Sequence, residues 1–280
     1  MDEFPYVSKN VHCEGSPYKG DMWKQESLIP SFPRFVSKGQ TMINKKISIE
    51  ENKAYPLAEK RFIQTCGFNM ETEKHQRMMK MGKKVRDDGI AGIDIQALVS
   101  YYGPEVCFNG KITIEDVELT WNYFEQIPAE CVEGVYFYML TAGECYFSSE
   151  DNIMDFLYAD IWGTNYVDAG IEVLTEEYIK ADMAERFGEK EVYLSEEFGP
   201  GYFGMPVIET KKFFKIMDGG LINVKVKDSG LMIPQKTCAG LYIVLNSPDI
   251  KAEPECTRCH GNAAGCQFCA IRAKLNEVKQ

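Results

Sequence analysis

Four cysteines near the end of the chain are the residues best suited to chemistry. They form two Cys-x-x-Cys pairs, Cys256/Cys259 and Cys266/Cys269, within one short segment. Two such turns bring four thiolates to one centre, so the pattern predicts a metal site that holds either zinc or a [4Fe–4S] cluster. Two disulfides are an alternative, and His260 after the first pair matches the attachment motif of a c-type haem. The second pair lacks that histidine, which favours the metal.

A segment rich in glycine and proline, residues 198–206, indicates a second kind of chemistry. Its glycines and prolines disfavour a regular element, and Gly201 and Gly204 let a ligand approach the backbone closely. Tyr202 between them is expected to project from a stiff loop. We expect this loop to contact a ligand, with a purely structural connector as the alternative. Residues 230–240 form a similar loop, in which Cys238 is either a buried small residue or a reactive thiol.

Charge and composition narrow the classes of function. A net charge of −11 disfavours nucleic acid and anionic membrane as partners, because phosphate would be repelled. We find no apolar run of membrane-spanning length and no export signal, so the ten cysteines favour a reducing cytoplasm, such as that of an anaerobe. Phosphate-loop, dinucleotide and serine-hydrolase motifs are missing, and the histidines at 12, 75 and 260 lack partners at catalytic spacing. Conventional histidine-based catalysis is therefore disfavoured.

Hydrophobic spacing predicts the elements that position these residues. Val167, Ile171, Leu174 and Tyr178 recur at helical spacing, which indicates a helix packed on a core. An Asn109-Gly110 pair between two apolar runs predicts a hairpin. Further helices are expected over 56–65, 71–88, 115–126 and 206–217, with another starting at a Ser148 cap. Strands are expected over 46–50, 135–140, 192–194, 222–226 and 240–245.

The order of these elements predicts the fold class. Helices and strands interleave without regular βαβ units, so we expect an α+β fold with a mainly antiparallel twisted sheet and flanking helices. Residues 1–46 are expected to form an extended N-terminal arm and residues 47–246 the body. Residues 247–280 would provide a linker and a small C-terminal four-cysteine metal module.

The two loops, in this order and spacing, resemble those of the activation domain of vitamin B12-dependent methionine synthase. That family shows an Arg-x-x-Pro-Gly-Tyr loop, then a helix, a strand, and a Met-x-Pro-x-x-Ser-x-Ser-Gly loop that runs into a strand. The likeness covers roughly residues 47–246. The matching segments here are Pro200-Gly201-Tyr202, Pro206, Met232-x-Pro234, residues 236–240, residues 138–143 and residues 168–173.

The resemblance implies roles for individual residues. Tyr202 would lie near the face of a corrin ring and act as the catalytic residue. The backbone from Gly199 to Gly201 would line the pocket of S-adenosylmethionine, and Tyr242 matches a residue beside the adenosine site. The family's arginine aligns with Glu197, which would repel the donor's carboxylate where an arginine would pair with it.

The second loop departs from the family pattern as well. Its two serine positions are occupied by Thr237 and Ala239, so one of the two hydroxyl groups is missing. Both departures leave open whether S-adenosylmethionine binds or whether reduction proceeds without a methyl donor.

The resemblance further implies reactivation of a cobalamin-dependent methyltransferase system, by reductive activation or reductive methylation of the cobalt in a partner protein. The cobalamin would come with that corrinoid protein or methyltransferase, and a low-potential electron donor would be a further partner. The alternative is a non-catalytic module, stapled by zinc, that docks on such a protein. An independent methyltransferase is a weaker alternative, because the glycine fingerprint and a general base are missing.

Overall fold

The computed structural model describes residues 41–108, 110–121, 124–144, 152–201 and 205–250. Most of the expected N-terminal arm, together with the four-cysteine tail, lies outside the described residues. The first described strand begins at Met42, inside the stretch expected to belong to the arm.

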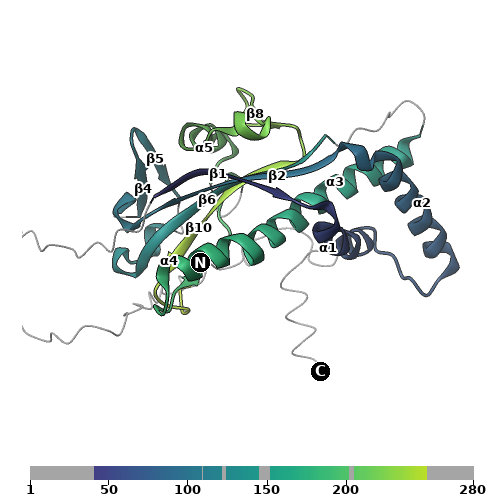
Figure 1. The fold of residues 1–280 in the computed structure, drawn as a ribbon. Helices are drawn as coiled ribbons and strands as arrows, with labels where there is room; N and C mark the ends of the chain where they lie inside the picture. Colours follow the sequence, from purple (N-terminus) through teal and green to yellow (C-terminus); the bar gives the residue numbers. More distant parts are fainter. Residues whose placement is uncertain (1–40, 109, 122–123, 145–151, 202–204, 251–280) are drawn as a thin grey trace, which may run out of the picture.

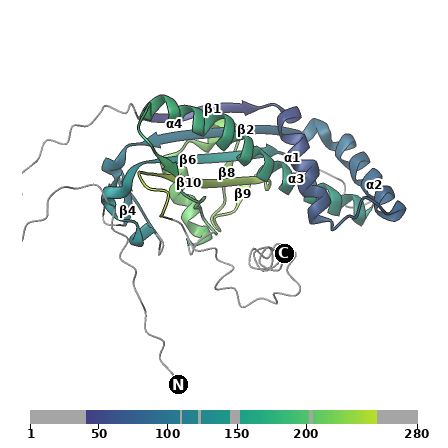
Figure 2. The ribbon, with the colours of Figure 1, turned by 90° about the horizontal axis from the view of Figure 1, so that it is seen from below.

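A five-stranded antiparallel sheet forms the centre of the molecule. Its strands are β1 (Met42–Ile49), β2 (Ile93–Tyr102), β6 (Val132–Gly143), β10 (Thr237–Leu245) and β7 (Tyr193–Leu194), in this order across the sheet. Figure 2 shows β1, β2, β6 and β10 side by side. The three central strands are almost entirely buried because both faces of the sheet are covered, so their sequences read as continuous apolar runs.

Helices cover one face of the sheet. They are α1 (Glu51–Thr65), α2 (Glu73–Gly89), α3 (Ile153–Val173) and α4 (Lys180–Phe187), with a π-helical turn, η5 (Leu174–Ile179), joining the last two. In Figure 1, α3 runs along the sheet, and α1 and α2 lie toward one end of it. Alternate side chains of the strands, including Ile95, Tyr138 and Tyr242, share a core with these helices.

The opposite face carries smaller elements. A three-stranded sheet is built from β3 (Cys107–Phe108), β4 (Lys111–Ile114) and β5 (Val117–Thr120). Beside it lie η6 (Val207–Glu209), α5 (Thr210–Ile216), η7 (Gly219–Ile222), and the pair β8 (Lys225–Val226) and β9 (Met232–Ile233). Phe137, Met139 and Leu241 of the large sheet pack against them. The two cores make the described part an α+β fold, as expected; in Figure 1, α5 and β8 lie above the sheet and α3 below it.

Several expected elements are confirmed. The stretches expected at 71–88, 135–140 and 240–245 correspond to α2, β6 and β10, and the hairpin expected at 109–110 joins β3 and β4. The stripe at Val167 and Leu174 is buried in the core. No helix in the described ranges has both the length and the apolar character needed to cross a bilayer.

Other expectations were wrong. The helix expected over 115–126 is instead strand β5 followed by a short 3-10 turn (Phe124–Gln126), because Val117 and Leu119 alternate with exposed residues on a small sheet. Of the strand expected over 222–226, only Lys225–Val226 is a strand: Ile222 ends a 3-10 turn and Asn223 has left-handed backbone. Strand β2 was not expected at all. The cap expected at Ser148 lies outside the described residues, and Asn152 caps α3 through Met154 N–H at 2.9 Å.

Candidate functional site

Residues 195–201 run along the free side of β10 and position Glu197. Ser195 N–H donates to the Ile243 carbonyl at 2.8 Å, and Phe198 and Leu241 exchange backbone hydrogen bonds of 3.0 and 2.7 Å. Successive side chains of an extended segment point to opposite faces of a sheet. Phe198 is fully buried in the core away from the helices, and Glu197 lies on the helix side, where it meets Tyr138.

Two glycines shape this segment. A Cβ at Gly199 would lie 2.7 Å from the Ala239 carbonyl oxygen, so glycine is required there for the close approach to β10. Gly201 has φ +96°, which favours glycine, and its N–H donates to the Met205 carbonyl at 2.8 Å. This hydrogen bond between Gly201 and Met205 brings the two ends of the glycine-rich loop together. Tyr202, the expected catalytic residue, lies outside the described residues.

Two stacked tyrosines lie beside Glu197 on the helix side of the sheet. Tyr138 of β6 and Tyr242 of β10 have ring centroids 5.7 Å apart. A Cβ at Gly240 would lie 2.6 Å from the Tyr138 hydroxyl, so the glycine makes room for that ring. The Tyr138 hydroxyl donates to the Glu197 carboxylate, and Thr175 donates to the Tyr242 hydroxyl at 3.1 Å. Burial raises the pKa of both phenols, so they act as neutral hydrogen-bonding groups.

A cavity of about 550 Å³ opens beside these residues. This volume lies in the range of small-molecule sites. Its lining comes from α1, α3, η5, the segment before Gly199, and β10: Arg61, Asp168, Ile171, Glu172, Thr175, Glu176, Glu197 and Tyr242. The π-helical turn supplies Thr175 and Glu176, and such turns are frequent at functional sites. Glu197 and Tyr242, two of the expected ligand contacts, therefore line one cavity.

The lining is strongly acidic. It carries four carboxylates and one guanidinium, Arg61, whose NH2 group pairs with Glu172 at 2.8 Å. Burial raises the pKa of Glu197, an effect that the nearby Asp168 adds to and the Tyr138 hydrogen bond opposes. Burial also raises the pKa of Asp168, and the positive charge of Arg61 opposes this. The electrostatics therefore favour a ligand with positive charge, and Arg61 is the cavity's one group that suits a negative charge.

The other expected contacts lie elsewhere. Neither Gly199 nor Gly201 lines the cavity, and the Thr237 hydroxyl donates to Thr141 at 2.9 Å across β10 and β6. Cys256, Cys259, Cys266 and Cys269 lie outside the described residues. Within the described ranges, no group of His, Cys, Asp and Glu side chains has an arrangement that suits a metal ion.

Sequence reasoning missed Arg61, Glu172, Thr175 and Glu176 as candidates. The only signal for Glu172 of α3 was the segment 168–173, which matched the family pattern without indicating which side chains face a ligand; Thr175 and Glu176 follow it in the π-helical turn. Arg61 had no signal, because α1 reaches the cavity only through helix packing.

A comparison with solved structures now bears on this geometry. The MetH reactivation domain bound to AdoHcy matches with a TM-score of 0.56 and 13% sequence identity, over 76% of this chain and 81% of that one. The chain shares the fold of the MetH reactivation domain. No family model matches the sequence, and neither does any curated protein.

The match to the MetH reactivation domain confirms the architecture that the loop resemblance implied. At 13% identity the similarity concerns the fold, so the role of each side chain must be argued from the contacts of this chain.

Proposed function

We propose that this protein reactivates a cobalamin-dependent methyltransferase and binds an S-adenosyl ligand in the cavity between Glu197, Tyr242 and α3. The main support is that the expected contacts Glu197 and Tyr242 line one cavity. The fold around this cavity is shared with the MetH reactivation domain, which binds AdoHcy. Fold similarity alone would leave the activity open.

The lining fits the chemistry of such a ligand. A sulfonium or ammonium group suits the carboxylates of Asp168, Glu176 and Glu197. Tyr242 offers a ring edge or face for an adenine, and the 550 Å³ volume accommodates a nucleoside with a short side chain. S-adenosylmethionine, when bound, would supply the methyl group that traps the reduced cobalt.

Arg61 could replace the arginine that the family has at the position of Glu197. A glutamate there repels a ligand carboxylate, but a guanidinium enters the same cavity from α1 and is held by Glu172 at 2.8 Å. An arginine fork suits a carboxylate in either position. We infer that Arg61, through exchange of its Glu172 partner, receives the carboxylate of the ligand.

The remaining parts of the proposal concern partners. A corrinoid protein would bring the cobalt, and Tyr202 would face the corrin ring as part of the loop that starts at Gly201. The four-cysteine tail would hold zinc or a [4Fe–4S] cluster, and a cluster would make the tail the entry point for electrons from a low-potential donor.

Isothermal titration calorimetry with AdoHcy tests the ligand part. We expect wild-type protein to bind, and Arg61→Gln to lower the affinity for AdoHcy at least about tenfold, because a hydrogen-bonded charge pair is worth about 1.5–3 kcal/mol. 5′-Methylthioadenosine lacks the amino-acid end, so its affinity should be the same for both proteins. Arg77→Gln on α2, an exposed arginine outside the cavity, is the matched control.

Lack of AdoHcy binding by folded wild-type protein would remove the S-adenosyl part of the proposal. An equal loss of both ligands in Arg61→Gln would contradict the role given to the guanidinium. The partner part is tested separately, by co-purification of a cobalt-containing protein from the native cell.

A further inference from the structure

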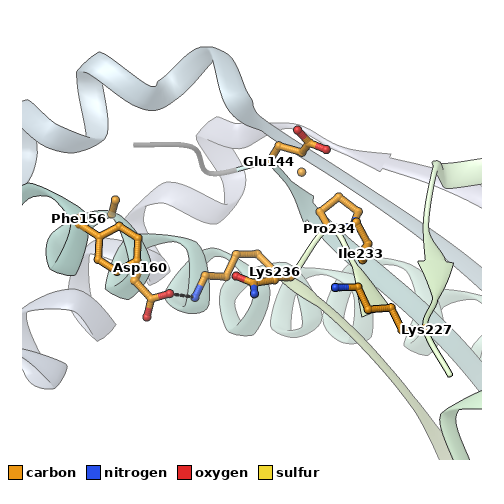
Figure 3. A pocket seen from close by; sticks show the side chains of 10 residues that line it. Glu144, Phe156, Asp160, Lys227, Ile233, Pro234 and Lys236 are labelled. Carbon is orange, nitrogen blue, oxygen red and sulfur yellow. Dashed lines mark hydrogen bonds and ion pairs between the residues drawn. The ribbon is translucent and has the colours of Figure 1, made fainter. Parts of the chain in front are cut away.

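A second cavity, of about 400 Å³, lies at the start of β10. It is bounded by the end of β6, the first turns of α3, and the segment from Ile233 to Lys236 (Figure 3). None of its lining residues belongs to the cavity at Glu197. The function proposed above does not use it.

The floor of this cavity is held by a hydrogen-bonded network around Lys236, in which Asp160 is exposed. Lys236 Nζ donates to Asp160 at 2.6 Å and to Thr164 at 2.9 Å, and its side chain is only 17% exposed. Its backbone carbonyl accepts the Ala142 N–H at 2.8 Å, which ties the segment to β6. The floor is therefore rigid, and the charges of Lys236 and Asp160 neutralise each other.

Lys227, at the rim of the cavity, supplies a positive charge that no carboxylate in the described ranges neutralises. Lys227 lines the cavity and has no ion-pair partner among the residues that the structure describes. Its N–H donates to the Leu231 carbonyl at 2.8 Å, so the turn between β8 and β9 holds it beside Ile233. Figure 3 shows the ammonium group directed toward the cavity, while the Glu144 carboxylate points away from it.

The walls are apolar and open to solvent. Phe156 of α3 lies at one end of the cavity, with Ile233 and Pro234 at the other (Figure 3). Phe156 is 48% exposed and Ile233 39% exposed. Ile153 and Leu157, on the same helical turn as Phe156, are also exposed. Exposed large apolar residues grouped around a cavity indicate a surface that a ligand covers.

We propose that this cavity is a second ligand site, which binds a small organic acid with a flat apolar body. The acid group pairs with Lys227, and the body lies against Phe156, Ile233 and Pro234. This combination of one cation with apolar walls favours neither a metal ion nor a sugar.

A pair of fluorescent probes tests the site in the full-length protein. 1-Anilinonaphthalene-8-sulfonate carries an anion on a flat apolar body, and N-phenyl-1-naphthylamine has the same body without the anion. We expect the sulfonate to bind more tightly, and Lys227→Met to weaken it about tenfold, as loss of a charged hydrogen bond does, with no effect on the amine. Phe156→Ala should weaken both probes.

Two variants serve as controls. Lys215→Met on α5 and Phe108→Ala on β3 remove an exposed lysine and an exposed phenylalanine outside the cavity, and both should bind the probes like wild type. Circular dichroism establishes that all variants are folded. The proposal is overturned if Lys227→Met and Phe156→Ala bind the sulfonate like wild type. It is also overturned if the two control variants lose as much affinity for the sulfonate as the two cavity variants. AdoHcy binding is unaffected in either case, so the two proposals are tested independently.

Discussion

Glu197 is the residue whose charge state matters most to the candidate site. Its carboxylate is largely buried and accepts a hydrogen bond from Tyr138, and burial raises its pKa. The folded protein therefore holds the Glu197 proton more tightly than the unfolded chain does. This contribution to stability is present below the ordinary carboxyl pKa and is lost as the pH rises through the raised value.

Glu197→Gln should remove that pH dependence. Relative to wild type, the variant should gain free energy of unfolding as the pH rises from about 4 to about 8, since one pKa unit corresponds to about 1.4 kcal/mol. Urea denaturation across this pH range measures the difference. Glu196→Gln, which alters an exposed neighbour, should follow the wild-type profile. A constant difference between Glu197→Gln and wild type at all pH values would contradict the pKa shift.

At the scale of elements, the packing of α1 against α2 and α3 decides where Arg61 lies. Phe62, next to it on α1, stacks on Trp162 of α3 with ring centroids 4.1 Å apart. Trp162 Nε1–H in turn donates to the Gly82 carbonyl of α2 at 2.8 Å. A Cβ at Gly82 would lie 2.7 Å from the Phe62 ring. The three helices thus meet at a point with no spare room.

Gly82→Ala tests this contact. Alanine favours a helix over glycine by about 1 kcal/mol, but overpacking a buried ring lowers stability by about 1–3 kcal/mol. We expect a net decrease in the free energy of unfolding, measured by urea denaturation. Lys80→Ala, at an exposed position of the same helix, should change it little. An increase in stability for Gly82→Ala would show that Phe62 moves aside freely.

At the scale of the whole molecule, the described body is covered on both sheet faces by its own elements. Helices α1, α3 and α4 bury one face, and β3 to β5 with α5 bury the other. We therefore expect the body to fold without help from the four-cysteine tail. Loss of the proposed metal site should therefore leave the fold intact.

Replacing Cys266 and Cys269 by serine should abolish the metal binding proposed for the tail while leaving the thermal unfolding of the body unchanged. Anaerobically purified wild-type protein, analysed for zinc and iron, identifies the metal: an iron–sulfur cluster gives a brown protein and zinc a colourless one. Cys66→Ser, which alters a cysteine at the end of α1, should leave the metal content as in wild type. A wild-type protein free of both metals would exclude the site.

The sequence alone determined the features that depend on neighbours in the chain. Apolar runs and helical spacing located β6, β10 and α2, and the Asn109-Gly110 pair located a hairpin. The loop expected over 230–240 was only partly right, because Met232–Ile233 form β9 and β10 begins at Thr237. Local alternation was misread at 115–126, because a helix face and a short half-buried strand share the spacing of Val117 and Trp121. Strand β2 was overlooked, although its apolar run resembles that of β6.

The tertiary structure alone decided how the candidate site is composed. Arg61 reaches the cavity because Phe62 and Gly82 fix the position of α1, and no pattern within α1 records that distant contact. Gly199, expected at a ligand, serves a close approach to Ala239 on another strand. Lys227 and Phe156 line the same cavity only because a hairpin and a helix meet at the start of β10. Such contacts arise from the packing of segments far apart in the chain, which spacing within one segment does not encode.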